Sequence, residues 1–437
     1  MKIRYQEAVP FVIIFVISLL IGAIAQFAIG PSELDNLTGD QGDYHRLAVK
    51  FGATGVFGEA EQVAYRAPLL PVVLGNVYSR FGAGIVTARC FNWLLAGAMA
   101  TLAAMIAYNL RQSLKSAWLA AGIVWLNSYW WLLQTEVMPE NLAAVLLGIS
   151  VWCWPNFSSR SRGVGRRVKK HGVWVAAGGV FLGLSLLCKP TFLPVLVLVP
   201  IIAVIFSPPS QRQSQVAFGL IFVLVALIPL GTWSYRNYRA LKHWVPMTTG
   251  SGEVFWGAHA PETMANAKGS WTNQPLPPEY QSRLDAANPR DREVLSSNVR
   301  WEAGWASLRA ASFLDVLGHF LLKPLRLWSP SVYFDGSGWW WILKLPLIVF
   351  NAVVLGSFFY QLRREFTFRP LVLSLVIALT ATCLIFWGTI RFQYVLLPII
   401  AAVSAQTFYL YLPDSRIFKI RRHKRKRDGQ FREAKFG

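Results

Sequence analysis

The stretch VWVAAGGVFLGLSLLCKPTFLPVLVLVPIIAVIF (residues 173–206) decides the fold of this chain. A helix of about 20 apolar residues crosses the roughly 30 Å of hydrocarbon in a bilayer. This stretch is too long for one crossing, and only Lys189 and Pro190 interrupt its apolar character. We therefore predict two membrane-spanning helices, 173–190 and 191–207, joined by a tight hairpin at Lys189–Pro190.

Apolar runs of similar length recur along the whole chain. Of its 437 residues, 54% are hydrophobic and only 15% are charged, which leaves too little polar surface for a soluble globule of this size. We predict an all-α polytopic membrane protein with about ten spans. The spans are expected at 9–30, 85–108, 116–133, 139–156, 173–190, 191–207, 215–234, 339–360, 370–388 and 393–411.

The distribution of basic residues predicts the orientation. Short cytoplasmic loops carry an excess of Lys and Arg, and every basic cluster beside a predicted span falls on one side. The clusters are Lys2 and Arg4; Arg111 and Lys115; Arg160, Arg162, Arg166, Arg167, Lys169 and Lys170; Arg212; Arg363, Arg364 and Arg369; and a tail from Arg416 to Lys435. Both termini are therefore expected in the cytoplasm. We interpret residues 9–30 as an uncleaved anchor, although Ala23-Ile24-Ala25 resembles a signal-peptide cleavage site.

The formal charge of +21 does not indicate nucleic acid. More than half of it lies in the loop after the fourth span and in the tail 413–437, where basic runs set topology and contact anionic lipids. The four cysteines, Cys90, Cys153, Cys188 and Cys383, lie in apolar spans without a CxxC spacing and are expected to be packing residues. The six histidines show no HxxxH or HExxH pair, so no dedicated metal cage is predicted.

Two segments on the outer side are too long to be turns, residues 31–84 and 235–338. Long connections in compact proteins are usually functional or disordered, and these are not of low complexity. The patterns 68–81 and 306–328 indicate helices that lie in the membrane interface. One integral-membrane domain, 1–412, would thus carry its chemistry in these two outer loops and end in a basic tail, 413–437.

The first outer loop is rich in acids, namely Glu33, Asp35, Asp40, Asp43, Glu59 and Glu61. A partly desolvated carboxylate at the membrane face suits a general base that takes a proton from a hydroxyl nucleophile. Asp40 and Asp43 are three residues apart at an expected helix start, which places them on one face. The alternative for any single acid here is ordinary solvated loop charge.

Cationic residues at the outer ends of spans form a second set: Arg66, Arg89, Lys189, Arg236 and Arg391. They could bind a phosphate at the interface, or extend to lipid headgroups. A further acid, Glu136, ends the third span. It either helps to position Asp40 or an acceptor hydroxyl, or simply forms the turn with Thr135 and Pro139.

Several motifs occur in a characteristic order along the chain. They are GDQGDYHRLA (39–48), YRAPLLPVVLGNVYSRFG (65–82), AR (88–89), LLQTE (132–136), GLSLLCKPTFLPVLVLVP (183–200), WSYRNY (233–238), WVPMTTGSGEVFWGAHAP (244–261) and GTIRFQYVLLPIIAA (388–402). Together they resemble the GT-C membrane glycosyltransferases of the protein-mannosyltransferase and lipid A aminoarabinose-transferase type. The order is more specific than any single motif.

The resemblance implies roles for particular residues. Asp40 would be the catalytic carboxylate and Asp43 its acidic neighbour. The donor phosphate would be held by Arg66, Arg89, Lys189 and Arg236, and acceptor contacts or positioning would involve Glu136, Tyr44, Asn237 and Arg391. The chain departs from the pattern at His259, where Asn is common, and at Ala67, where Pro is common, which leaves acceptor contacts in doubt. It also has no large C-terminal soluble domain, which favours a small or lipid-linked acceptor. A divalent metal stays open, because the superfamily includes metal-dependent and metal-independent enzymes.

The resulting hypothesis is an inverting transfer of a sugar from a polyprenyl-phosphate carrier to a lipid-linked, glycan or protein hydroxyl, at the outer face of a bacterial inner membrane. Three alternatives compete with it. A lipid-linked sugar flippase would need ionisable residues at mid-membrane, whereas here they cluster at span ends. A glycan polymerase or ligase fits the large outer loop with arginines. A non-enzymatic scaffold anchored by tryptophans leaves the acidic pair unexplained.

Overall fold

The computed structural model describes residues 5–28, 37, 39–59, 62–154, 164–289, 291–332, 341–364, 366 and 368–411. Every regular element among these residues is helical, and they contain no strand. The predicted all-α polytopic class is therefore confirmed. Lys2, Arg4, Arg160, Arg162, Glu33, Asp35, Glu61 and the tail 413–437 lie outside the described residues.

Each of the predicted spans contains an apolar helix. Five stretches are long and apolar enough to cross a membrane: α4 (Ile85–Arg111), α8 (Val164–Cys188), α10 (Pro209–Leu241), α16 (Trp341–Leu362), and the run of α18 (Ile390–Gln393), η2 (Tyr394–Leu396) and α19 (Leu397–Leu410). The other spans hold shorter apolar stretches, in α1 (Tyr5–Ala28), α5 (Leu114–Trp125), α7 (Glu140–Trp152), η1 (Pro190–Phe192) with α9 (Val195–Phe206), and α17 (Arg369–Ile385).

One span differs in detail from the prediction. The third is not one helix over 116–133, because α5 ends at Trp125 and a short helix α6 (Ser128–Leu132) follows. Asn127 causes the break, since its side-chain oxygen accepts hydrogen bonds from the backbone N–H groups of Tyr129 and Trp130 and caps α6. The predicted interruption at Lys189 is present: α8 ends at Cys188, and Lys189 adopts an extended conformation before Pro190.

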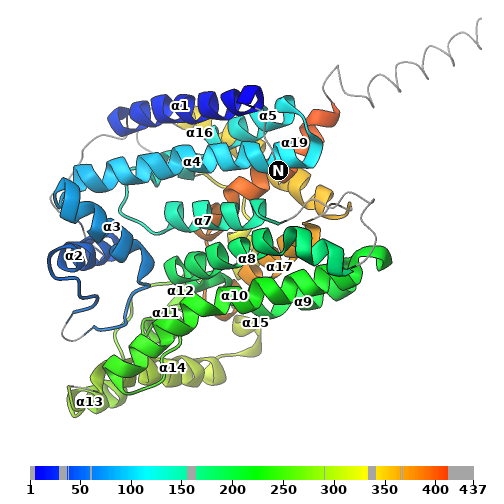
Figure 1. Ribbon diagram of the computed structural model, residues 1–437. Helices are drawn as coiled ribbons and strands as arrows, with labels where there is room; N and C mark the ends of the chain where they lie inside the picture. The colour runs from blue at the N-terminus through cyan, green and yellow to red at the C-terminus, as the bar shows by residue number, and fades with distance from the viewer. Residues whose placement is uncertain are drawn as a thin grey trace, which may run out of the picture.

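Helix α4 lies at the centre of one half of the bundle, where it packs on α1, α5, α7 and α19 (Figure 1). Its buried face is built of small residues, among them Ala96, Ala100, Ala103 and Ala107. Small side chains let helix backbones approach closely, which is how helices associate when lipid removes the hydrophobic driving force. Cys153, Cys188 and Cys383 are buried as expected, but Cys90 is exposed on α4.

Two long connections carry the remaining helices. The first connection (residues 29–84) holds α2 (Gly39–Thr54) and α3 (Leu69–Phe81). The second connection (residues 242–340) holds α11 (Ser251–His259), α12 (Pro261–Asn266), α13 (Pro278–Asp285), α14 (Arg292–Ala310) and α15 (Phe313–Leu327). The single helix expected over 306–328 is thus wrong: Ser312 begins a new helix, because its hydroxyl caps the backbone N–H of Asp315.

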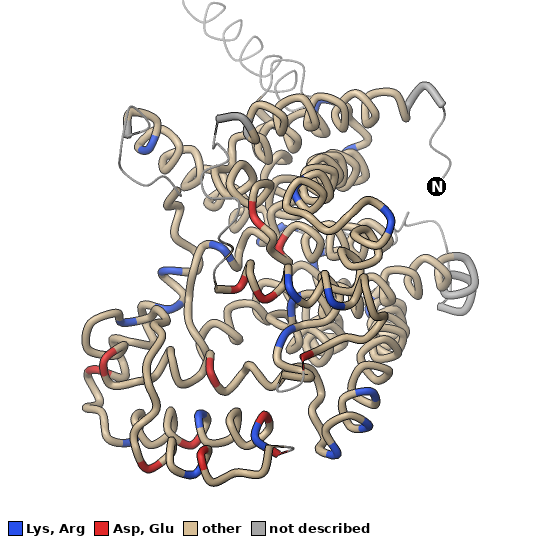
Figure 2. Tube along the Cα trace, turned by 90° about the vertical axis from the view of Figure 1, so that its left-hand side faces the viewer, with Lys and Arg blue, Asp and Glu red and all other residues tan. Residues whose placement is uncertain are grey.

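The two connections contact each other. The backbone N–H of Thr249 donates to the carbonyl of Ala64 at 3.0 Å. The carboxylate of Glu293 accepts from the backbone N–H groups of Val63 and Ala64 at 2.7 and 2.9 Å. Acidic residues gather in the centre and lower part of Figure 2 and are absent from the helices at its top, within the part of the chain drawn in colour.

Helices α2 and α3 pack with their backbones almost in contact. A Cβ atom added at Gly52 would lie 2.6 Å from the carbonyl oxygen of Gly75, and one at Gly75 would lie 2.7 Å from that of Ala48. Only glycine permits this approach at both positions. The contact fixes α2, whose first turn carries Asp40 and Asp43, against α3, which follows Arg66.

Candidate functional site

Asp40 and Asp43 share one partner, Arg66. The guanidinium Nη2 of Arg66 lies 2.7 Å from an oxygen of Asp40 and 2.6 Å from an oxygen of Asp43. Both acids lie in the first turns of α2, where the helix dipole favours negative charge. Arg46, one turn further along α2, donates to the other oxygen of Asp43 at 2.6 Å. The two predicted site carboxylates are therefore brought together by an arginine.

Two tyrosines surround the Arg66 guanidinium. Its carbon lies 4.7 Å from the ring centroid of Tyr65 and 5.8 Å from that of Tyr44, distances at which the aromatic face attracts a cation. Tyr44 is buried, and burial raises the pKa of its hydroxyl, so this group stays protonated and able to donate a hydrogen bond. Arg66 is thus held on two sides by carboxylates and rings.

A second ionic group lies at the start of α7. The carboxylate of Glu140 is fully buried and pairs with the ammonium of Lys189 at 2.6 Å, and the Nε of Arg391 donates to the same carboxylate oxygen. Glu140 is the first residue of α7, Lys189 follows the end of α8, and Arg391 lies in α18. Three helix ends therefore converge on one carboxylate.

Arg391 links the two groups, because its Nη2 also lies 3.6 Å from an oxygen of Asp40. We call Asp40, Asp43, Arg66, Glu140, Lys189 and Arg391 the charged cluster. It contains three acids and three bases, drawn from the first connection and from three membrane-spanning helix ends. In this structure three of the cations considered for phosphate binding, Arg66, Lys189 and Arg391, neutralise carboxylates of the chain itself.

Glu136 lies beside the charged cluster in the turn between α6 and α7. Burial raises the pKa of its carboxyl to about 7, with Glu140 and Asp40 contributing in the same direction and Arg391 opposing. The turn is tied to α2, because the side-chain oxygen of Gln41 accepts from the backbone N–H of Val137 at 3.0 Å. A carboxyl whose pKa lies near neutrality can change its protonation state at physiological pH.

Arg89 also reaches this turn. Its Nε donates to the backbone carbonyl of Thr135 at 3.1 Å. Nearby on α4, Asn92 donates to the carbonyl of Glu136. The structure thus bonds Arg89 to the turn that carries Glu136.

Arg236 and Asn237 hold backbone instead. Arg236 donates to the carbonyl of Val63 at 2.8 Å and packs its guanidinium 4.8 Å from the ring centroid of Trp233. The amide of Asn237 is fully buried and donates to the carbonyls of Val245 and Met247, both at 3.1 Å. These two predicted site residues shape the loops around the site, and the hydrogen bonds described here join them to each other and to backbone carbonyls, not to the charged cluster.

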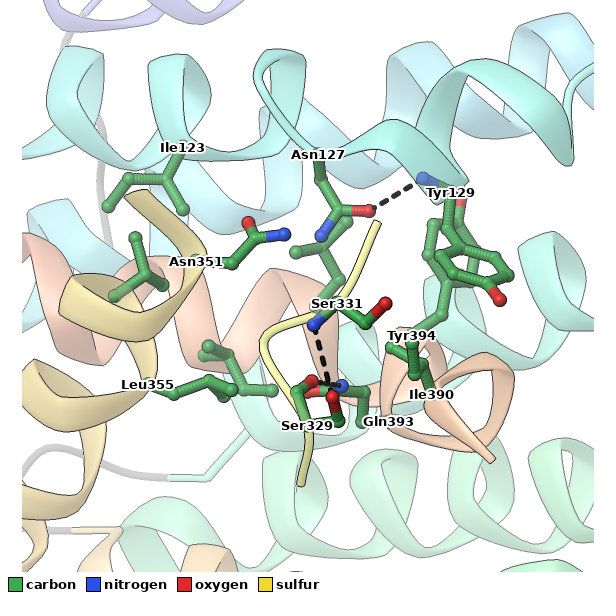
Figure 3. Close-up of a pocket in the computed structure, with 13 residues that line it drawn as sticks. Ile123, Asn127, Tyr129, Ser329, Ser331, Asn351, Leu355, Ile390, Gln393 and Tyr394 are labelled. Carbon is green, nitrogen blue, oxygen red and sulfur yellow. Dashed lines mark hydrogen bonds between the residues drawn. The ribbon is translucent and has the colours of Figure 1, made fainter. Parts of the chain in front are cut away.

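A small cavity lies among α5, α16 and α19, lined by amides and hydroxyls that include Asn127, Asn351 and Gln393 (Figure 3). Its volume is about 30 Å³, which is the space of one or two water molecules and too small for a sugar. Tyr394, which also lines it, donates from its hydroxyl to the side-chain oxygen of Asn141 at 2.6 Å. This cavity is therefore too small to be the substrate site, and Tyr394 ties its wall to α7.

The charged cluster does not fit a divalent metal. Asp40 and Asp43 accept from arginines, and within the described residues no three His, Cys, Asp or Glu side chains converge. A metal site requires several oxygen or nitrogen ligands around one point. No step of the chemistry is therefore routed through a metal.

Sequence reasoning missed the central role of Glu140. A carboxylate at the first position of an apolar span was the available signal, because ionisable residues inside membrane segments are rarely without a partner.

Sequence reasoning also missed a buried group in the second connection. The ammonium of Lys323 donates to Nε2 of His259 and to the carbonyl of Leu384, both at 2.9 Å, and His319 lies alongside. His259, singled out as a departure from the family pattern, is fully buried there.

Comparisons with known proteins agree with this fold. Residues 65–245 match the family model of dolichyl-phosphate-mannose-protein mannosyltransferases. That match contains Arg66, Arg89, Glu136, Lys189 and Arg236, while Asp40 and Asp43 precede it. No curated protein sequence matches the chain.

Among solved structures, the chain is similar to the archaeal oligosaccharyltransferase AglB from Archaeoglobus fulgidus, in complex with an inhibitory peptide and a dolichol-phosphate. The TM-score is 0.54 at 12% identity, over 93% of this chain and 51% of that one, so this chain spans about half its length. ArnT from Cupriavidus metallidurans bound to undecaprenyl phosphate aligns with a TM-score of 0.39 at 14% identity, over 91% and 77% of the two chains. That score is too low to carry an argument. The chain therefore shares the fold of this archaeal oligosaccharyltransferase, and its residues 65–245 resemble the dolichyl-phosphate-mannose-protein mannosyltransferases.

Proposed function

We propose that the chain is an inverting glycosyltransferase that moves a sugar from a polyprenyl-phosphate carrier to a hydroxyl of a lipid-linked, glycan or protein acceptor. The observation that carries this proposal is the charged cluster. It combines carboxylates that can take a proton with three cations that can stabilise phosphate, at the point where three helix ends meet the first connection. Acid–base chemistry and anion stabilisation are the two requirements of this transfer.

The reaction is a single in-line displacement at the anomeric carbon. The acceptor oxygen forms a bond to that carbon as the bond from the carbon to the carrier phosphate oxygen breaks. The acceptor proton passes to Asp40, and the electron pair of the broken bond leaves on the polyprenyl phosphate. Attack from the side opposite the leaving group inverts the anomeric configuration.

The leaving phosphate develops negative charge, which preorganised cations stabilise. Arg391 and Lys189 are the inner donors of the charged cluster, with Arg66 and Arg89 on its flanks. Arg66 also holds Asp40 and Asp43 close together, so Asp43 acts by fixing Arg66. Arg236 and Asn237 support the loops that enclose the site. Glu136 and Tyr44 border the place where an acceptor hydroxyl must approach Asp40.

The location follows the charge pattern of the sequence. With Arg111, Lys115, Arg212 and Arg363 at the cytoplasmic ends of their helices, both long connections and the charged cluster face outward. The protein is then a multi-pass protein of a bacterial inner membrane with cytoplasmic termini, in contact with membrane lipids and not with nucleic acid.

Transport is the competing class. A flippase is expected to carry buried charges near mid-membrane. Glu140 is the first residue of its helix, and Lys189 directly follows the last residue of α8, so these two buried ions lie at helix ends. This arrangement supports interfacial chemistry. A polymerase or ligase that transfers whole oligosaccharides remains the alternative within the enzyme class, since AglB is an oligosaccharyltransferase.

The decisive experiment measures transfer of labelled sugar from a panel of synthetic polyprenyl-phosphate sugars in membranes that contain the wild type or Asp40→Asn. Expression and folding are checked in both. Asp315→Asn is the matched control, because Asp315 is exposed and pairs with Lys268 in the second connection.

We expect transfer with at least one donor, kept in the control and reduced by about two to four orders of magnitude in Asp40→Asn, the usual contribution of a general base. Transfer that survives in Asp40→Asn overturns the assignment of the base. Absence of transfer with every donor, together with movement of the carrier across the bilayer, would favour the flippase.

A further inference from the structure

A second, larger cavity opens between the two connections, away from the membrane-spanning helices. Its volume is about 380 Å³. The first connection contributes Gln62 and Tyr65, and α11, α13 and α14 contribute the other walls. The remaining lining residues include Glu253, Gln281, Glu293, Ser296, Ser297 and Arg300. This size lies within the usual range for small-molecule sites, roughly 300–1,000 Å³.

The walls of the cavity are fixed by hydrogen bonds across the two connections. Glu293 accepts from two backbone N–H groups of the first connection and from the hydroxyl of Thr249 at 2.7 Å. The hydroxyl of Tyr65 donates to Glu253 at 2.8 Å. The cavity is therefore a preformed feature of the fold, which lowers the ordering cost of binding.

Tyr65 connects this cavity to the charged cluster. One side of the residue lines the cavity, and its ring centroid lies 4.7 Å from the guanidinium carbon of Arg66. Arg66 in turn contacts Asp40 at 2.7 Å. A molecule seated in the cavity is thus separated from the proposed base by two side chains.

The chemistry of the lining is that of a carbohydrate site. It mixes donors and acceptors without excess charge, because Glu253 and Glu293 offset Arg292 and Arg300, and the amides and hydroxyls supply both hydrogen-bonding directions. A sugar hydroxyl donates and accepts at once, so it matches such a surface. A lipid chain needs an apolar wall, and Leu284 is the single large aliphatic side chain in the lining.

We propose that this cavity binds a sugar unit of the acceptor, so that the acceptor is a polyhydroxylated glycan. The inference rests on the proposed function and names its acceptor class.

The test is saturation-transfer NMR on the full chain in lipid nanodiscs, without donor. The probes are methyl and octyl glycosides of mannose, glucose, galactose and N-acetylglucosamine. Gln281→Trp is the blocking variant, because Gln281 is exposed at the cavity wall on α13 and a large ring would fill the space. Ser282→Trp is the matched control, since Ser282 is exposed on the same helix outside the lining. Glu253→Gln keeps the shape of the wall while removing a charge.

We expect the wild type and Ser282→Trp to bind at least one glycoside. Gln281→Trp should bind it with an affinity lower by about tenfold or more, which corresponds to the loss of roughly one well-formed set of hydrogen bonds. Equal binding of methyl and octyl forms indicates a free glycan, whereas tighter binding of octyl forms indicates a lipid-linked one. Both support the proposal.

No binding of any glycoside, or equal binding in Gln281→Trp and the wild type, overturns it. A serine- and threonine-rich peptide that accepts sugar equally in both proteins overturns it as well. Failure of the proposed function is distinguishable, because glycosides would then bind while no donor supports transfer.

Discussion

The carboxylate of Glu140 lies 2.6 Å from the ammonium of Lys189, and the two side chains are 0% and 10% exposed. Removing such ions from water costs several kcal/mol each, and the pair recovers this only with good geometry and further partners. Arg391 supplies that further partner. The fold thus fixes two cations at the site through a single acid.

Glu140→Gln should therefore destabilise the protein strongly. The substitution leaves Lys189 buried without its counter-charge and Arg391 with only its longer contact to Asp40, and breaking a buried pair in this way costs about 3–5 kcal/mol. The measurement is the free energy of unfolding in detergent. The double variant Glu140→Gln/Lys189→Met should recover part of the loss, because it removes one of the stranded charges.

Glu302→Gln is the control for this prediction. Glu302 pairs with Arg283 at 2.5 Å, but both side chains are about half exposed, and such pairs contribute about 0–1 kcal/mol. Equal losses of unfolding free energy in Glu302→Gln and Glu140→Gln would show that burial does not increase the contribution of the Glu140 pair to stability.

Glu136 should give the transfer reaction a pH-dependent limb near neutrality. Burial raises the pKa of its carboxyl to about 7, so the group changes from protonated to ionised as the pH rises through that value. If the ionised carboxylate accepts a hydrogen bond from the hydroxyl of the sugar acceptor, the rate of transfer rises between pH 6 and 8. Glu136→Gln should flatten this rise, while Glu59→Gln, on an exposed acid of the first connection, should leave it unchanged. A rise that persists unchanged in Glu136→Gln would exclude Glu136 as its source.

The spans could be predicted because hydrocarbon thickness imposes one length on every crossing. Boundaries set by local capping were harder: the break at Asn127 depends on one side chain bonding two backbone N–H groups. The pairing of Asp40 and Asp43 followed from helical spacing. Their shared partner Arg66 lies 23 residues from Asp43, and nothing in the spacing of a helix selects a partner so far along the chain.

The roles of the cations needed the tertiary structure. Arg236 and Arg391 look alike in sequence, since each follows an apolar span end. Arg236 is committed to backbone carbonyls of the first connection, whereas Arg391 contacts Glu140, which is 251 residues away. Which partner an arginine meets is decided by how the helices pack, and packing has no local signature in the sequence.

Lys323 should make the stability of the protein rise with pH above neutrality. Burial lowers the pKa of this amine to about 7 from its usual 10.5. Between these values the unfolded chain holds a proton that the folded chain has released, so the free energy of unfolding increases with pH by at most about 1.4 kcal/mol per unit. From pH 7.5 to 9 the gain is about 2 kcal/mol.

Lys323→Met should remove this gain, and Lys268→Met, at a partly exposed lysine paired with Asp315, should keep it. Burial also lowers the pKa values of His259 and His319, to about 3 and 4. These histidines therefore change the pH dependence of stability only below about pH 6.5, outside this window. Chemical unfolding of the three proteins at both pH values measures the slope, and an equal slope in Lys323→Met would show that the amine is charged in the folded protein.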